Sequence, residues 1–152
     1  MTNTNYIFFA LALVTGALIP VQAATNAAFS KSIGNPFITG LMVFVIGLAA
    51  MVLFVLVTRQ PLPLGKFATA PLYGYLGGLI VPTYVVMITL ITPRIGLGNA
   101  IGLILTGQLI AAVLIDQFGW FNVAVRQIDT TRVIGIVLMI GGIYLVMRKP
   151  AS

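Results

Sequence analysis

Four polar side chains lie inside long apolar stretches of this sequence and are the first candidates for chemistry. Gln22 and Asn26 are four residues apart, which places them on one face of a helix. Tyr84 and Gln108 lie within later apolar stretches, and Gly107 leaves room beside the Gln108 amide. In a membrane such groups either line a substrate cavity or hydrogen-bond to neighbouring helices. We favour a cavity for Gln108 and packing for Tyr84, and both roles stay open for the first pair.

Asp116 is the one acidic residue in or near an apolar stretch. A carboxylate in a membrane could bind a cation or take up a coupling proton. However, Asp116 lies within about one helical turn of Gly119 and Trp120, where the apolar stretch ends. We therefore favour an ion pair between Asp116 and a loop arginine, and keep ion or proton coupling as the alternative.

Several glycines share helix faces and are candidates for close packing. Spacings of four or seven residues place small side chains on one face, where another helix can approach closely. The last such face is expected to be an assembly surface, formed within the chain or with a second subunit. The predicted packing residues are Gly74 with Gly78, and Gly135 with Gly142; Gly98 and Gly102 have the same spacing.

Composition excludes most catalytic chemistry. The 152 residues include no Cys, no His and only two acids, Asp116 and Asp129. Thiolate, transition-metal and acid–base sites therefore lack side chains, and we expect no enzyme activity, no metal site and no cofactor. The eight Lys and Arg residues are scattered singly or in pairs, which does not indicate nucleic-acid binding.

The elements that position these residues are membrane helices. The chain is 60% hydrophobic and only 7% charged, with a mean hydropathy of +1.13, which indicates a surface that faces lipid. We predict an all-α integral membrane bundle forming a single transmembrane domain over residues 1–152. Five transmembrane helices are expected at about residues 6–29, 37–58, 72–92, 97–118 and 133–147. Pro20 and Pro82 fall inside these spans, and a short turn is expected at residues 92–96.

The positive charges give no clear orientation. With five spans, one side of the membrane carries Arg59, Lys66, Arg126 and Arg132, and the other carries Lys31, Arg94, Arg148 and Lys149. The positive-inside rule therefore does not distinguish the two sides. Either other features select one topology, or the chain inserts in both orientations and pairs antiparallel.

The chain resembles the YdcZ-type branch of the drug/metabolite transporter (DMT) superfamily. Three segments carry the resemblance: residues 16–26, residues 107–119 with Gln108 and Asp116, and the glycine-rich residues 135–144. The loop at residues 59–63 is also similar to that family. The resemblance implies a multi-pass protein of the bacterial inner membrane that transports small molecules and works as a pair of helical units.

The resemblance has one notable departure. The small multidrug members of the superfamily use a membrane Glu in the first helix, whereas Gln22 and Asn26 are the nearest polar groups here. Export of cations by that route is therefore not expected. Our first hypothesis is a secondary transporter, an exporter of a small-molecule substrate, that acts as a homodimer. The alternative is a non-transporting membrane subunit that packs onto another membrane protein.

Overall fold

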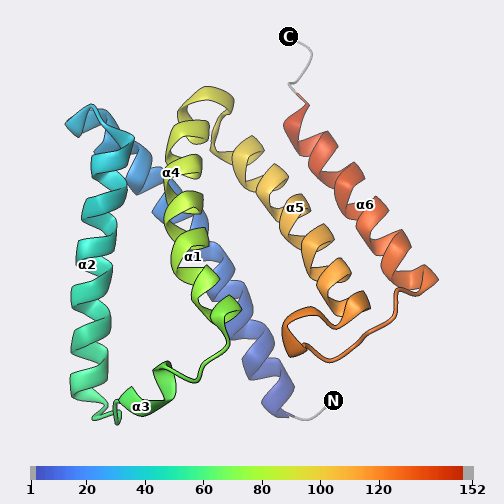
Figure 1. Ribbon diagram of the computed structural model, residues 1–152. Coiled ribbons are helices and arrows are strands. Elements are labelled where there is room, and N and C mark those ends of the chain that lie inside the picture. Colours follow the sequence, from blue (N-terminus) through green and yellow to red (C-terminus); the bar gives the residue numbers. More distant parts are fainter. Residues whose placement is uncertain (1–2, 149–152) are drawn as a thin grey trace. The chain divides into compact units, whose positions relative to one another are not determined.

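The computed structural model describes residues 3–148, and every regular element in that range is a helix (Figure 1). The side chains of Asn3 and Thr4, and residue Lys149 of the charge count, lie outside the described part. The elements are α1 (Asn3–Ile33), α2 (Pro36–Val57), α3 (Leu64–Phe67), η1 (Leu72–Leu76), α4 (Gly77–Ile95), α5 (Leu97–Phe118), η2 (Trp120–Asn122) and α6 (Thr130–Met147). Five segments are long and apolar enough to span a membrane, with η1 and α4 forming one of them. The predicted all-α fold with five transmembrane helices is confirmed.

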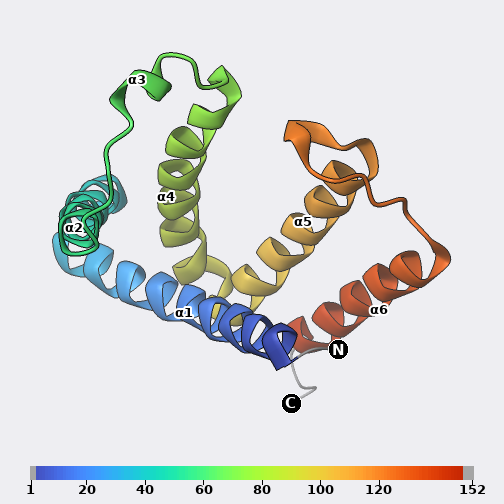
Figure 2. The same ribbon diagram turned by 90° about the horizontal axis from the view of Figure 1, so that it is seen from below.

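The chain divides into two compact units, Met1–Pro93 and Arg94–Ser152. In the first unit α1 packs against α2 near the turn that joins them, and the two helices then diverge (Figures 1 and 2). In the second unit α5 and α6 pack together as an antiparallel pair. The long loop between α5 and α6 contains η2 and folds against the end of α5.

The α1–α2 turn is defined by local sequence. Gly34 ends α1 with a φ of +79°, a backbone conformation that side chains with a Cβ rarely adopt. Asn35 then caps α2, because its Oδ1 accepts hydrogen bonds from the backbone N–H groups of Phe37 (2.9 Å) and Ile38 (3.2 Å). Pro36 occupies the first turn of α2, where the missing N–H has no helical partner to lose.

Three helices, α1, α4 and α6, extend further than the sequence indicated, and α6 starts three residues earlier, at Thr130. α1 has 31 residues, which corresponds to about 46 Å and exceeds a hydrocarbon core of roughly 30 Å. It therefore tilts in the bilayer or continues beyond the hydrocarbon. α4 continues through Pro93 to Ile95, so the turn expected at residues 92–96 is shorter than predicted. Proline is tolerated there because only one backbone hydrogen bond near the helix end is lost.

The first unit has a small core that lies where the end of α1, the start of α2 and the second half of α4 converge. Its buried residues are Ala23, Asn26, Thr39, Gly40, Val85, Ile88, Thr89 and Thr92. The four α4 residues follow helical spacing, so they form one face of that helix. Most other apolar side chains of the spans are exposed, as expected for helices that lipid or a partner subunit surrounds.

Candidate functional site

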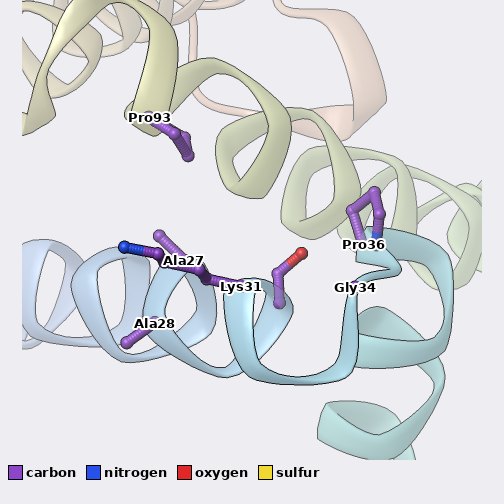
Figure 3. A pocket seen from close by; sticks show the side chains of 7 residues that line it. Ala27, Ala28, Lys31, Gly34, Pro36 and Pro93 are labelled. Carbon is purple, nitrogen blue, oxygen red and sulfur yellow. The ribbon is translucent and has the colours of Figure 1, made fainter.

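A cavity of about 460 Å³ opens beside the α1–α2 turn, within the first unit (Figure 3). Its walls include Ala27, Ser30, Lys31 and Gly34, together with Pro36 and Pro93. Pro93 of α4 faces Ala27 and Lys31 of α1 across the cavity, and Pro36 lies at one end. The walls are therefore mostly small and apolar, with one ammonium and one hydroxyl group. The sequence did not single out Lys31 as a site residue.

Asn26 is buried near this cavity and has an unused donor. The residue is only 6% exposed, and its Nδ2 has no hydrogen-bond partner among the described residues. Asn26 lies one turn before Ser30 on the same face of α1, so it is close to the wall of the cavity, although it does not line the cavity itself. An enclosed amide donor without a partner is unfavourable, and a substrate-binding role for Asn26 stays a prediction.

Thr92 on α4 is a second buried group of this kind, and the sequence did not reveal it. The residue is 8% exposed, and its Oγ1 has no hydrogen-bond partner in the part of the chain that the structure describes. Two other buried threonines do satisfy their hydroxyls locally: Thr89 donates to the carbonyl of Val85 at 2.7 Å, and Thr39 donates to that of Asn35 at 3.0 Å. Thr92 directly precedes Pro93, a wall residue of the cavity.

The other predicted binding residues occupy different places. Gln22 is exposed on α1 although Asn26 is buried. Tyr84 is partly buried and its hydroxyl is enclosed without a hydrogen-bond partner, beside an open depression of about 390 Å³ that Leu79 and Thr83 also line. Gln108 is exposed on α5, in the second unit. The structure therefore assigns three of these residues to one unit and Gln108 to the other.

Asp116 forms an ion pair with Arg132, the kind of partner that the sequence favoured. Its Oδ2 lies 3.3 Å from Arg132 Nη2, and both side chains are about three-quarters buried. Arg132 Nη1 also donates to the carbonyl of Arg126, whose N–H donates to the carbonyl of Asp116 at 2.9 Å. Asp129 Oδ1 caps α6 by accepting from the Arg132 N–H at 2.7 Å. The carboxylate therefore ties the loop between α5 and α6 to both helices, and a coupling role for it stays a prediction.

The glycines fall into two groups. A Cβ built on Gly102 would lie 2.9 Å from Ile143 Cγ2, and one built on Gly40 would lie 3.0 Å from Val86 Cγ2. These two positions therefore allow α5 to approach α6 and α2 to approach α4. No atom lies within 4 Å of a Cβ built at the four predicted packing positions, Gly74, Gly78, Gly135 and Gly142, among the described residues. Their predicted packing role therefore stays a prediction, and it requires a second subunit or another membrane protein.

Comparison with known proteins identifies a family. Residues 7–145 match the family model DMT_YdcZ, which is described as "Putative inner membrane exporter, YdcZ". No curated protein and no solved structure matches the chain. Because the match covers nearly all of the five spans, the chain is a multi-pass protein of the inner membrane and belongs to the YdcZ exporter family.

Proposed function

We propose that the protein is a secondary transporter that exports a small molecule and that it acts as a homodimer. Family membership supports export across the inner membrane. The polar groups of the spans support a path for a solute, because Asn26 Nδ2 and the Tyr84 hydroxyl are buried without a hydrogen-bond partner among the described residues. The sequence offers no catalytic set that would favour an enzyme instead.

The observation that carries this proposal is the exposed amide of Gln108 near the middle of α5. Its side chain has no hydrogen-bond partner among the described residues, and lipid tails provide none. Gln22 on α1 is exposed in the same way. Such amides are stabilised if they face a water-filled path or a second copy of the chain.

A dimer is supported by the amount of surface that the spans leave open. Five helices are few for enclosing a route across about 30 Å of hydrocarbon. Two copies would double the number of helices, and an antiparallel pair would create the inverted repeats that alternating access commonly uses. The even division of positive charges between the two sides is compatible with such a pair.

The test uses purified protein in liposomes loaded with a panel of labelled small solutes, with efflux as the readout. We expect Gln108→Leu to abolish efflux of the transported solute while membrane insertion and cross-linked dimer stay unchanged. Gln60→Leu, which changes an exposed amide in a loop, is the matched control and should keep wild-type efflux. Unchanged efflux by Gln108→Leu would remove this residue from the site.

The same assay addresses the alternative of a non-transporting subunit. If pure wild-type protein releases none of the solutes, a membrane subunit that packs onto another protein is favoured. The unpartnered glycine faces of α6 would then be the expected contact surface.

A further inference from the structure

We propose that the cavity beside the α1–α2 turn binds a small organic anion: a carboxylate or phosphate group on an apolar body. This inference rests on the proposed transport function and names the substrate class. Its walls come from the last turns of α1, the start of α2 and the end of α4, so the residues that line it are separated in the sequence. It differs from the depression beside Tyr84.

The charge of the first unit favours an anion as the ligand. Residues 1–93 contain three basic side chains, Lys31, Arg59 and Lys66, and no Asp or Glu. Lys31 is the one that lines the cavity, and it has no acidic partner in the described part of its unit. A bound cation would therefore meet a like charge with no carboxylate to neutralise it, whereas an anion would complete an ion pair.

Hydrogen-bonding capacity points the same way. The buried polar atoms without partners near the cavity are Asn26 Nδ2 and Thr92 Oγ1, and both can donate. Neither Asn26 nor Thr92 lines the cavity itself, but Asn26 lies next to Ala27 and Thr92 next to Pro93, and the ammonium of Lys31 and the hydroxyl of Ser30 are donors in the wall. Such donors suit the oxygen atoms of a carboxylate or a phosphate, which accept several hydrogen bonds each.

The start of α2 adds a favourable field. Gly34 and Pro36 line the cavity at this end, and the N-terminus of a 22-residue helix attracts negative charge. The N–H groups of Phe37 and Ile38 already bind Asn35 Oδ1, so α2 contributes its dipole more than free donors. The helix end therefore supports the Lys31 site and does not form one by itself.

The cavity walls define the rest of the ligand. Ala27, Ala28, Gly34, Pro36 and Pro93 present small apolar surfaces, and the volume of about 460 Å³ falls within the range usual for small-molecule sites. A strongly polar solute would leave these walls unmatched. We therefore infer one anionic group that contacts Lys31 and an apolar part that contacts the alanine and proline side chains.

A matched series of ligands tests the inference on the full-length protein, purified in a neutral detergent and stripped of lipid. The probes are benzoate and phenyl phosphate, with benzamide as the neutral analogue and benzamidinium as the cationic one. We expect the anions to raise the melting temperature in proportion to their concentration, because they bind the folded state, and the other two probes to have little effect.

Variants locate the binding. Lys31→Gln is expected to weaken anion binding by about tenfold or more, the effect of losing one charge-assisted contact. Asn26→Leu should weaken it as well. Lys66→Gln removes an equal charge from an exposed position of the short helix α3 in the same unit and should leave the affinity unchanged. Stabilisation by benzamidinium that survives Lys31→Gln, or none by either anion, would overturn the proposal.

A second arm separates a free solute from a lipid headgroup, which carries the same phosphate chemistry. Nanodiscs of phosphatidylcholine are compared with nanodiscs that also contain phosphatidylglycerol. If the anionic lipid stabilises wild type more than Lys31→Gln and displaces benzoate, the site binds a lipid headgroup. If benzoate binds equally in both, the site binds a free anion.

The assay also distinguishes this inference from the proposed function. If the protein transports cations and binds no anion, the proposed substrate class is wrong, but the proposal that the protein is an exporter stands. Anion binding through Lys31 without efflux of any solute would keep the site and remove the transport function.

Discussion

Arg132 on α6 forms an ion pair with Asp116 on α5, with 3.3 Å between Nη2 and Oδ2. The same guanidinium donates a hydrogen bond to the carbonyl of Arg126 in the intervening loop. One side chain thus joins the end of α5, the loop and the start of α6. Gln117 reinforces the connection, because its Oε1 accepts from the N–H of Ile128 at 2.6 Å. These contacts indicate that Asp116 has a structural role, which is to connect α5, the loop and α6. A carboxylate without a partner in the membrane would instead indicate coupling to an ion.

Asp116→Asn tests that assignment. We expect the variant to keep efflux but to unfold at a lower temperature, because Arg132 on α6 loses its charged partner. A partly exposed ion pair of this kind contributes about 0.5–1 kcal/mol. The fluorescence of Trp120, the only tryptophan of the chain, reports directly on this loop during thermal unfolding in detergent.

The double variant Asp116→Asn with Arg132→Gln supplies the control. If the two side chains act through each other, its destabilisation is smaller than the sum of the single effects. Loss of efflux in Asp116→Asn, with the melting temperature unchanged, would instead make this carboxylate a coupling residue.

The contact between Gly102 and Ile143 sets how closely α5 and α6 approach. We expect Gly102→Val to destabilise the protein by about 1–3 kcal/mol, because the new Cβ would overlap Cγ2 of a stiff β-branched side chain. Thermal unfolding measures the effect. Gly107→Val makes the same change on the same helix where no atom lies within 4 Å of the added Cβ, and it should be much milder.

Ile143→Ala provides the rescue for this pair. Removing the obstructing methyl groups should recover part of the stability that Gly102→Val loses, which would show that the contact is the cause. Equal destabilisation by valine at positions 102 and 107 would show that helix propensity, and not this contact, decides the result.

Hydropathy was sufficient to predict the five spans, because an apolar stretch in lipid must form its backbone hydrogen bonds within itself. α5 has the predicted bounds, residues 97–118. The end of α4 was less predictable. A proline removes one backbone hydrogen bond but need not end a helix, and α4 continues through Pro93 to Ile95. α6 begins at Thr130 and not at residue 133, because Asp129 supplies an N-terminal cap ahead of the apolar residues.

The candidate site was harder to predict than the fold. Spacing showed that Gly98 and Gly102 share a face, but not that only Gly102 faces Ile143 closely. Thr92 gave no signal, because threonines in helices commonly bond their own backbone, as Thr89 does. In the sequence, Lys31 did not differ from the other basic residues near helix ends, and only its position in the cavity wall distinguishes it from them. These facts depend on contacts between helices, which a single sequence does not contain.

Gly142 tests the proposed dimer. No described atom lies within 4 Å of a Cβ at this position, so Gly142→Leu should leave the fold of the single chain intact. If α6 meets a second copy on this face, the leucine should abolish the dimer detected by chemical cross-linking in membranes, and efflux should fall with it.

Gly47→Leu on α2 is the matched control, since its Cβ would also meet no described atom and we assign no packing role to it. It should cross-link as wild type does. A dimer that persists in Gly142→Leu would show that this face of α6 is not the subunit interface.

Insertion of the wild-type chain in both orientations is one of the two hypotheses that the balanced charges leave open, and it is the one that an antiparallel pair requires. Five spans place the two ends of the chain on opposite sides, so a C-terminal reporter identifies the orientation. We expect fusions to a cytoplasm-specific fluorescent protein and to a periplasm-specific phosphatase both to be active.

Single lysines should then shift the ratio of the two orientations in opposite directions, because positively charged loops are retained in the cytoplasm. Gln60→Lys should favour the phosphatase, and Ser32→Lys, on the other side, should favour fluorescence. Activity of only one wild-type fusion would exclude mixed orientation, and with it the antiparallel pair.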